Sequence, residues 1–220
     1  MNPSGSAALL RAGPGDRRND GGAVPAARHR RRQPGAAAGI GLWVFIGVAS
    51  TLFALFLAAY VMRMDGADWS PIAMPWQLRL STGLLLTGSL ALQAAAAAAR
   101  GARTAPARRL FLAGGAAALA FLASQLWAWQ ALQAIQVTLA GNPAASFFYL
   151  LTAMHGLHVA GGLAGWAWAA RSASRGAPDE AWRLALCARY WHFLLAVWLL
   201  LFAALGWLTP AVVRYLCGTA

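Results

Sequence analysis

The chain has 220 residues, of which 60% are hydrophobic and only 11% charged, and its formal net charge is +12. A soluble domain usually has about a quarter of its residues charged, so this composition excludes an ordinary soluble protein. All 18 basic residues are arginines, and most lie in three clusters, at 1–38, 100–109 and 171–189. Clusters of basic residues in alternate loops are typical of a membrane protein, in which they lie on the cytoplasmic side. We therefore expect no nucleic-acid partner.

Five apolar blocks follow one another along the chain, and each is long enough to cross about 30 Å of hydrocarbon as a helix. None of them contains an aspartate or a glutamate. Little chain is left between them, so no second, soluble domain is expected. The sequence predicts an all-α integral membrane protein, a bundle of five transmembrane helices in one domain, 39–220. The predicted spans are 39–63, 78–99, 109–134, 145–170 and 184–208.

The segment 1–38 precedes the first span and is rich in Gly, Pro, Ala and Arg, without aromatic residues. Such a composition buries too little apolar surface to offset the entropy of ordering, which predicts a disordered tail. An arginine-rich tail is also found in mitochondrial transit peptides, but Asp16 and Asp20 count against that reading. Arginines at alternate loops predict a cytoplasmic N-terminus and an external C-terminus.

The first three spans contain polar residues but no histidine. In the first, Trp43 and Tyr60 lie near the two ends, where aromatic rings favour the membrane interface. The loop after it, with Asp65 and Asp68, is predicted to be an ordered external turn. In the third span Gln125 lies deep, where we expect it to form a hydrogen bond to a neighbouring helix.

Histidines distinguish the last two spans. His155 and His158 share one helical face with Gly162 and Gly165, and we expect this polar, small face to contact protein. His192 lies in the fifth span. Three readings are open: ligands, with His158 and His192 as axial ligands of a haem; members of a proton path; or neutral rings with hydrogen-bond partners such as Gln125, Thr152 and Tyr190.

The first two readings lack supporting residues. A zinc site needs a third or fourth ligand, and a proton path needs acids, but the spans contain no carboxylate. Cys187 and Cys217 lie near opposite ends of the fifth span, too far apart for a disulfide. We therefore favour hydrogen-bonded structural histidines and expect no metal site in this chain.

Four segments, in order, resemble the haem-copper oxidase subunit III family. FFYLLTAMHGLHVAGGL at 147–163 is similar to that family's HG-L-H-V signature, and YWHF at 190–193 with Val197-Trp198 is similar to its YWHF-x-x-VW segment. LWVF at 42–45 and AAY at 58–60 resemble its first retained helix, and QLWAW at 125–129 its Q-x-x-E-[YW] patch. The resemblance covers about 39–208 and fits the short, five-helix bacterial form.

This resemblance implies an accessory role in cytochrome c oxidase and aerobic respiration. Subunit III binds no haem or copper, which belong to subunit I, and it packs on subunit I and other oxidase subunits. It also binds phospholipid in a cleft between its helices. The resemblance implies no catalytic residue and carries over as structural, lipid-contact or subunit-contact positions Trp43, Gln125, His155, His158, Gly162, Gly165, Tyr190, Trp191, His192 and Trp198.

Three positions depart from the family pattern. The acids usual in the family are replaced by Ala49, Ala128 and Leu195. Related accessory subunits accompany quinol oxidases and nitric oxide reductases, so these complexes remain alternatives. A third alternative, of another class, is a stand-alone haem-binding electron carrier that uses His158 and His192.

Overall fold

A computed structural model of the protein describes residues 35–173 and 180–217. The chain divides into two units, Met1–Arg32 and Gln33–Ala220, and all described residues belong to the second. The predicted disordered tail therefore lies outside the described residues, apart from its last few positions, where the first helix begins at Ala36.

Five long helices confirm the predicted spans to within a few residues. They are α1 Ala36–Arg63, α2 Gln77–Arg100, α3 Thr104–Ala134, α4 Pro143–Ala173 and α5 Glu180–Trp207. Each is long and apolar enough to cross a membrane, so the protein is a multi-pass membrane protein. A short sixth helix, α6 Pro210–Cys217, follows α5 and was not predicted.

Local sequence explains several helix boundaries. The side-chain oxygen of Asn142 accepts a hydrogen bond of 3.0 Å from the backbone N–H of Ala145, and Pro143 opens α4 with a preset φ. Pro210 opens α6 in the same way. Between α2 and α3 the chain turns within Gly101, Ala102 and Arg103, with Ala102 in the left-handed region at φ 56°. This short turn requires α2 and α3 to be antiparallel neighbours.

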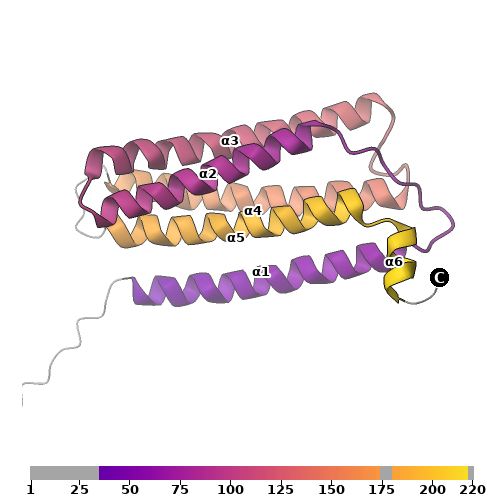
Figure 1. Cartoon of the computed structure of the whole chain (residues 1–220), viewed down its shortest axis with the longest axis horizontal. Coiled ribbons are helices and arrows are strands. Elements are labelled where there is room, and N and C mark those ends of the chain that lie inside the picture. Colours follow the sequence, from indigo (N-terminus) through magenta and orange to yellow (C-terminus); the bar gives the residue numbers. More distant parts are fainter. Residues whose placement is uncertain (1–34, 174–179, 218–220) are drawn as a thin grey trace, which may run out of the picture. The chain divides into compact units, whose positions relative to one another are not determined.

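Helices α2, α3, α4 and α5 form a closed bundle, and α1 lies outside it, along α4 and α5 (Figure 1). The backbones of α2 and α3 come close where both carry glycine, because a Cβ on Gly88 would lie 3.3 Å from the carbonyl oxygen of Gly114. Small residues allow such approach in membranes, where dispersion contacts replace the hydrophobic effect between helices.

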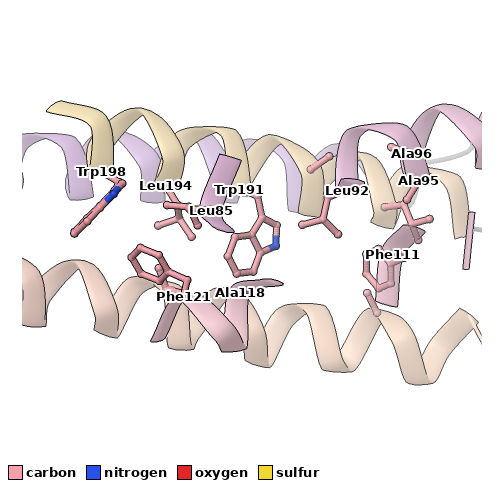
Figure 2. Close-up of a cluster of buried hydrophobic side chains, with 14 of the residues drawn as sticks. Leu85, Leu92, Ala95, Ala96, Phe111, Ala118, Phe121, Trp191, Leu194 and Trp198 are labelled. Atoms are coloured by element: carbon pink, nitrogen blue, oxygen red, sulfur yellow. The ribbon is translucent and has the colours of Figure 1, made fainter. Parts of the chain in front are cut away.

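The bundle core contains apolar side chains from all four bundle helices, and Figure 2 shows those of α2, α3 and α5 pointing toward one another. Its members include Leu85, Leu92, Phe111, Phe121, Trp191, Leu194 and Trp198. In α1, by contrast, only 11% of the most apolar window is buried, against 39% in each of the other four spans. Most of the α1 surface is therefore available to lipid or to another protein.

Two contacts hold the loop that joins α1 to α2, which the sequence predicts to be an ordered turn. Arg63 and Asp68 form an ion pair of 2.6 Å, and the Trp69 ring packs on Tyr60 with centroids 5.3 Å apart. The hydrogen bond from Arg63 lowers the pKa of the Asp68 carboxyl below its ordinary value. Because a lowered pKa keeps the carboxylate ionised to lower pH, the pair is lost only as pH falls below the ordinary aspartate range.

Candidate functional site

His155 is fully buried inside a ring of aromatic side chains. Its imidazole centroid lies 5.2 Å from Trp198, 5.6 Å from Phe121 and 6.3 Å from Phe53. Among the described residues neither of its ring nitrogens has a hydrogen-bond partner. The expected hydrogen bonding of this histidine was therefore wrong, because rings from α1, α3 and α5 close around it. In this site His155 acts as a packing ring.

Two of the side chains that we expected to form hydrogen bonds with the histidines, Gln125 and Thr152, have other partners. Gln125 donates a hydrogen bond of 2.8 Å to Ser81 of α2, which confirms that it links neighbouring helices. Thr152 accepts a hydrogen bond of 3.1 Å from the indole of Trp129. These bonds connect α2 to α3 and α3 to α4.

His158 connects α4 to α1. Its Nδ1 donates to the carbonyl oxygen of Met154 at 2.7 Å, within α4. The ring faces α1, with centroid distances of 5.2 Å to Phe53 and 5.9 Å to Phe45. Tyr190 of α5 donates to the backbone carbonyl of His158 at 3.0 Å, so its hydroxyl contacts this residue's backbone and not its ring.

His192 connects α5 to α2. Its Nδ1 lies 2.7 Å from the hydroxyl of Ser89, and its Nε2 lies 3.2 Å from Oε1 of Gln93. An amide oxygen only accepts, so Nε2 donates and Nδ1 accepts from Ser89 in the neutral ring. His158 packs against α1 and His192 against α2, so this geometry does not bring the two rings to one haem.

Three tryptophans among the predicted site residues differ in their surroundings. Trp191 and Trp198 are each 1% exposed, and the Trp198 indole donates to Thr82 at 2.9 Å. Trp43 is 59% exposed, as expected near an interface, with the Arg189 guanidinium 5.7 Å from its ring. Two of the three rings therefore belong to the bundle core, and the third lies on the exposed surface of α1.

The positions that depart from the family pattern lie inside the protein. Ala49 and Ala128 are 2% and 0% exposed, and Leu195 is half-buried against the core. A carboxylate at Ala49 or Ala128 would need a buried partner to offset its desolvation. The small alanines avoid that cost.

The glycines of α4 differ in how closely other residues pack against them. A Cβ on Gly162 would lie 2.8 Å from the Tyr190 ring, so this residue allows α4 and α5 to pack closely. Gly161 and Gly165 are exposed, and a Cβ added to either would meet no atom within 4 Å. The expectation that Gly165 contacts protein was therefore wrong within this chain, because Gly165 and Gly161 border a pocket.

This pocket has a volume of about 750 Å³ and lies between the N-terminal half of α1, the C-terminal half of α4 and the N-terminal half of α5. Its walls are almost entirely apolar, and they include Leu42, Phe45, Leu157, Gly161, Gly165 and Leu186. Arg183 lines it too, with its guanidinium 4.8 Å from the Trp168 ring and 5.4 Å from the Trp182 ring. An apolar chamber with a cation held by indole rings suits a chain-bearing anion.

This pocket was not predicted from the sequence. Its signal was present in the pair Gly161 and Gly165, which we read as a helix-packing motif, and in Arg183 next to Trp182. Over the described part of the chain, no group of three or more His, Cys, Asp and Glu side chains is arranged to hold a metal ion.

Comparison with known proteins gives one family. The family model described as cytochrome c oxidase subunit III matches residues 27–209. A cytochrome c oxidase subunit 3 from Synechocystis sp. is 30% identical over 170 residues, which cover 74% of this chain and 72% of that protein. The protein of the same name from Thermostichus vulcanus is 28% identical over 77% of this chain and 87% of its own length.

A further relative extends the match. A probable cytochrome c oxidase subunit 3 from Nocardia farcinica is 27% identical over 192 residues, which cover 84% of this chain and 94% of that protein. The residues that the family model matches span all five long helices and the segments that carry His155, His158 and His192. The chain therefore belongs to the cytochrome c oxidase subunit III family.

Proposed function

We propose that this chain is the non-catalytic subunit III of a haem-copper terminal oxidase of the bacterial cytoplasmic membrane, with its N-terminus in the cytoplasm. Haem and copper belong to the catalytic subunit I, and this chain stabilises that subunit by packing and by holding phospholipid. The complex carries electrons to oxygen in aerobic respiration. Family membership supports the assignment to an oxidase.

The pocket beside α1 supports the lipid part of this function. Its walls come from three helices, and its size, about 750 Å³, suits acyl chains. Arg183 lies near the N-terminal end of α5, where it can meet a lipid phosphate at the membrane surface. The rings of Trp168 and Trp182 hold the guanidinium in place.

The positions of the histidines support a structural role for these side chains. The His155 ring is enclosed by aromatic side chains, the His158 ring packs against Phe45 and Phe53 of α1, and His192 is hydrogen-bonded to Ser89 of α2. All three stabilise contacts between helices. This favours the structural reading over the haem-binding electron carrier.

Filling the pocket tests the lipid proposal. Gly161→Leu places a side chain in open space, so the fold is retained while the pocket is filled. We expect the purified complex to lose about one phospholipid, measured by native mass spectrometry. Gly47→Leu is the matched control, because Gly47 lies on the exposed surface of α1, also with nothing within 4 Å. An unchanged lipid content in Gly161→Leu would contradict a lipid in this pocket.

His158→Ala tests the structural role of that ring. The substitution removes its contacts with Phe45 and Phe53, which are worth about 1 kcal/mol beyond buried area. We therefore expect a lower yield of the intact complex and an unchanged haem spectrum in the complex that remains. An altered haem spectrum at normal yield would speak against an accessory role.

The apolar residues Ala49, Ala128 and Leu195 support a second candidate function. If the acids usual at these positions serve a proton-related role in the family, this chain lacks it. A partner that is a quinol oxidase or a nitric oxide reductase is the alternative. The substrate of the co-purified catalytic subunit distinguishes these complexes.

A further inference from the structure

The short helix α6 lies beyond the part of the chain that the family accounts for. The match to the subunit III family ends at residue 209, and α6 begins at Pro210. With 8 residues it is about 12 Å long, far too short to cross a membrane. Its role therefore depends on its own direction and contacts.

The chain changes direction between α5 and α6. After α5 ends at Trp207, the hydroxyl of Thr209 accepts a hydrogen bond of 3.4 Å from the backbone N–H of Val212, which caps the new helix. Figure 1 shows α6 running across the direction of the long helices, at the end of the bundle where α5 terminates. Because the long helices cross the membrane, a helix that runs across them lies along the membrane plane.

This helix has an inner and an outer face. On the inner face Val213 is half-buried and packs against the apolar cluster that includes Tyr60 of α1 and Leu201 of α5. On the outer face Val212 and Tyr215 are 41% and 78% exposed. At about 100° per residue these two side chains lie on one side of the helix, away from Val213.

An exposed apolar stripe on α5 leads to the start of α6. Leu200 is 54% exposed, and Trp207, seven residues later on the same helical face, is 74% exposed. Trp207 lies where α5 ends, and tryptophan and tyrosine are both enriched where a membrane meets water. With Tyr215 exposed on α6, the surface that the membrane covers continues from α5 onto α6.

Three features favour lipid over protein as the neighbour of this outer face. The ring of Tyr215 suits the apolar boundary while its hydroxyl reaches the headgroups. Arg214 is exposed at the border between the inner and outer faces, as is usual in helices that lie in a membrane interface. A specific protein interface buries about 800 Å² per partner, much more than the outward side chains of a helix of 8 residues provide.

We propose that α6 is an interfacial helix, which lies in the headgroup–acyl boundary at the end of α5 with Val212 and Tyr215 in contact with phospholipid. Val213 fastens this membrane-bound helix to the cluster that joins α1 to α5. Lipid contact at α6 thereby fixes the depth of this end of the protein in the membrane. This role does not depend on which catalytic subunit the chain accompanies.

A nitroxide label tests the depth and the neighbour of α6 together. In a chain with Cys187→Ala and Cys217→Ala, a single cysteine is introduced as Tyr215→Cys or, as the matched control, as Ala67→Cys in the loop between α1 and α2, where Ala67 is exposed. The full complex that contains the labelled chain is reconstituted in phospholipid vesicles. We expect the label at 215 to collide several-fold more often with oxygen, which concentrates in lipid, than with a water-soluble nickel chelate. The label at 67 should show the reverse preference.

Two outcomes would overturn the proposal. More frequent collisions with the nickel chelate at 215 would place α6 in water, and low collision rates with both reagents would show that protein covers it. A second measurement keeps both native cysteines and serves where the labelled variants do not fold. With the photo-crosslinking residue p-benzoylphenylalanine in place of Tyr215, irradiation in native membranes should raise the mass of the chain by that of one phospholipid, and the same residue in place of Ala67 should give no lipid adduct. A crosslink from 215 to another protein, or no lipid adduct there, would contradict an interfacial helix.

Discussion

Trp198→Ala should cause the largest loss of stability among single substitutions in this protein, about 3–5 kcal/mol. Trp198 is 1% exposed and lies between two rings, with centroids 5.2 Å from both Phe121 and His155. Its indole also donates the hydrogen bond of 2.9 Å to Thr82 that connects α5 to α2. Truncation leaves a cavity in the centre of the bundle and removes this bond.

Two further variants separate these effects. Trp198→Phe keeps a ring but removes the hydrogen bond, and should cost less than the alanine variant, about 1–3 kcal/mol. Trp207→Ala is the control, because Trp207 is 74% exposed, and it should change stability little. The measurement is the unfolding midpoint in mixed micelles, followed by circular dichroism. Equal midpoints for Trp198→Ala and Trp207→Ala would show that Trp198 does not hold the bundle together.

Gly115→Ala should also destabilise the bundle, although alanine is the better helix former. A Cβ at this position would overlap the indole of Trp166, which lies against the glycine and donates a hydrogen bond of 2.9 Å to the carbonyl of Phe111. Overpacking of this kind costs about 1–3 kcal/mol, and loss of the hydrogen bond adds about 1 kcal/mol. The unfolding midpoint in micelles should therefore fall.

The same substitution at a glycine with no neighbouring atoms should change the stability in the opposite direction. Gly47 lies within α1 with nothing within 4 Å, so Gly47→Ala should stabilise the chain by up to about 1 kcal/mol. A pair of variants with one chemical change and opposite effects isolates the packing contribution. If both variants shift the midpoint in the same direction, Trp166 is not seated on Gly115 as described.

The spans were predictable because hydropathy is read directly from sequence. A membrane requires long apolar helices, and the absence of acids from the five blocks left little choice of boundaries. The interhelical role of Gln125 was predictable for a similar reason, since a deep amide needs a partner. Its bond to Ser81 confirms that reasoning.

The surroundings of His155 could not be predicted in this way. Helical periodicity places it on one face with His158, but it does not say that Phe53, Phe121 and Trp198 from three other helices enclose the ring. These contacts depend on how the helices pack, which is a tertiary property. The rule that a buried imidazole needs a hydrogen bond therefore gave the wrong expectation for this residue.

The pocket was missed for a related reason. A glycine pair four residues apart indicates close helix packing, yet only Gly162 packs closely in this part of α4, and Gly161 and Gly165 face open space. Whether a helix covers a glycine depends on where the neighbouring helices lie. Here α1 packs along α4 and α5 and leaves room beside these glycines (Figure 1).

The most direct test of the proposed accessory role is purification of the tagged chain from its native membranes in mild detergent, with identification of its partners and an optical spectrum. We expect a haem-copper catalytic subunit to co-purify and the haem signal to disappear when this chain is isolated from it. A chain that comes out alone and still carries haem would contradict the accessory role, and would make His155, His158 and His192 the ligands to test.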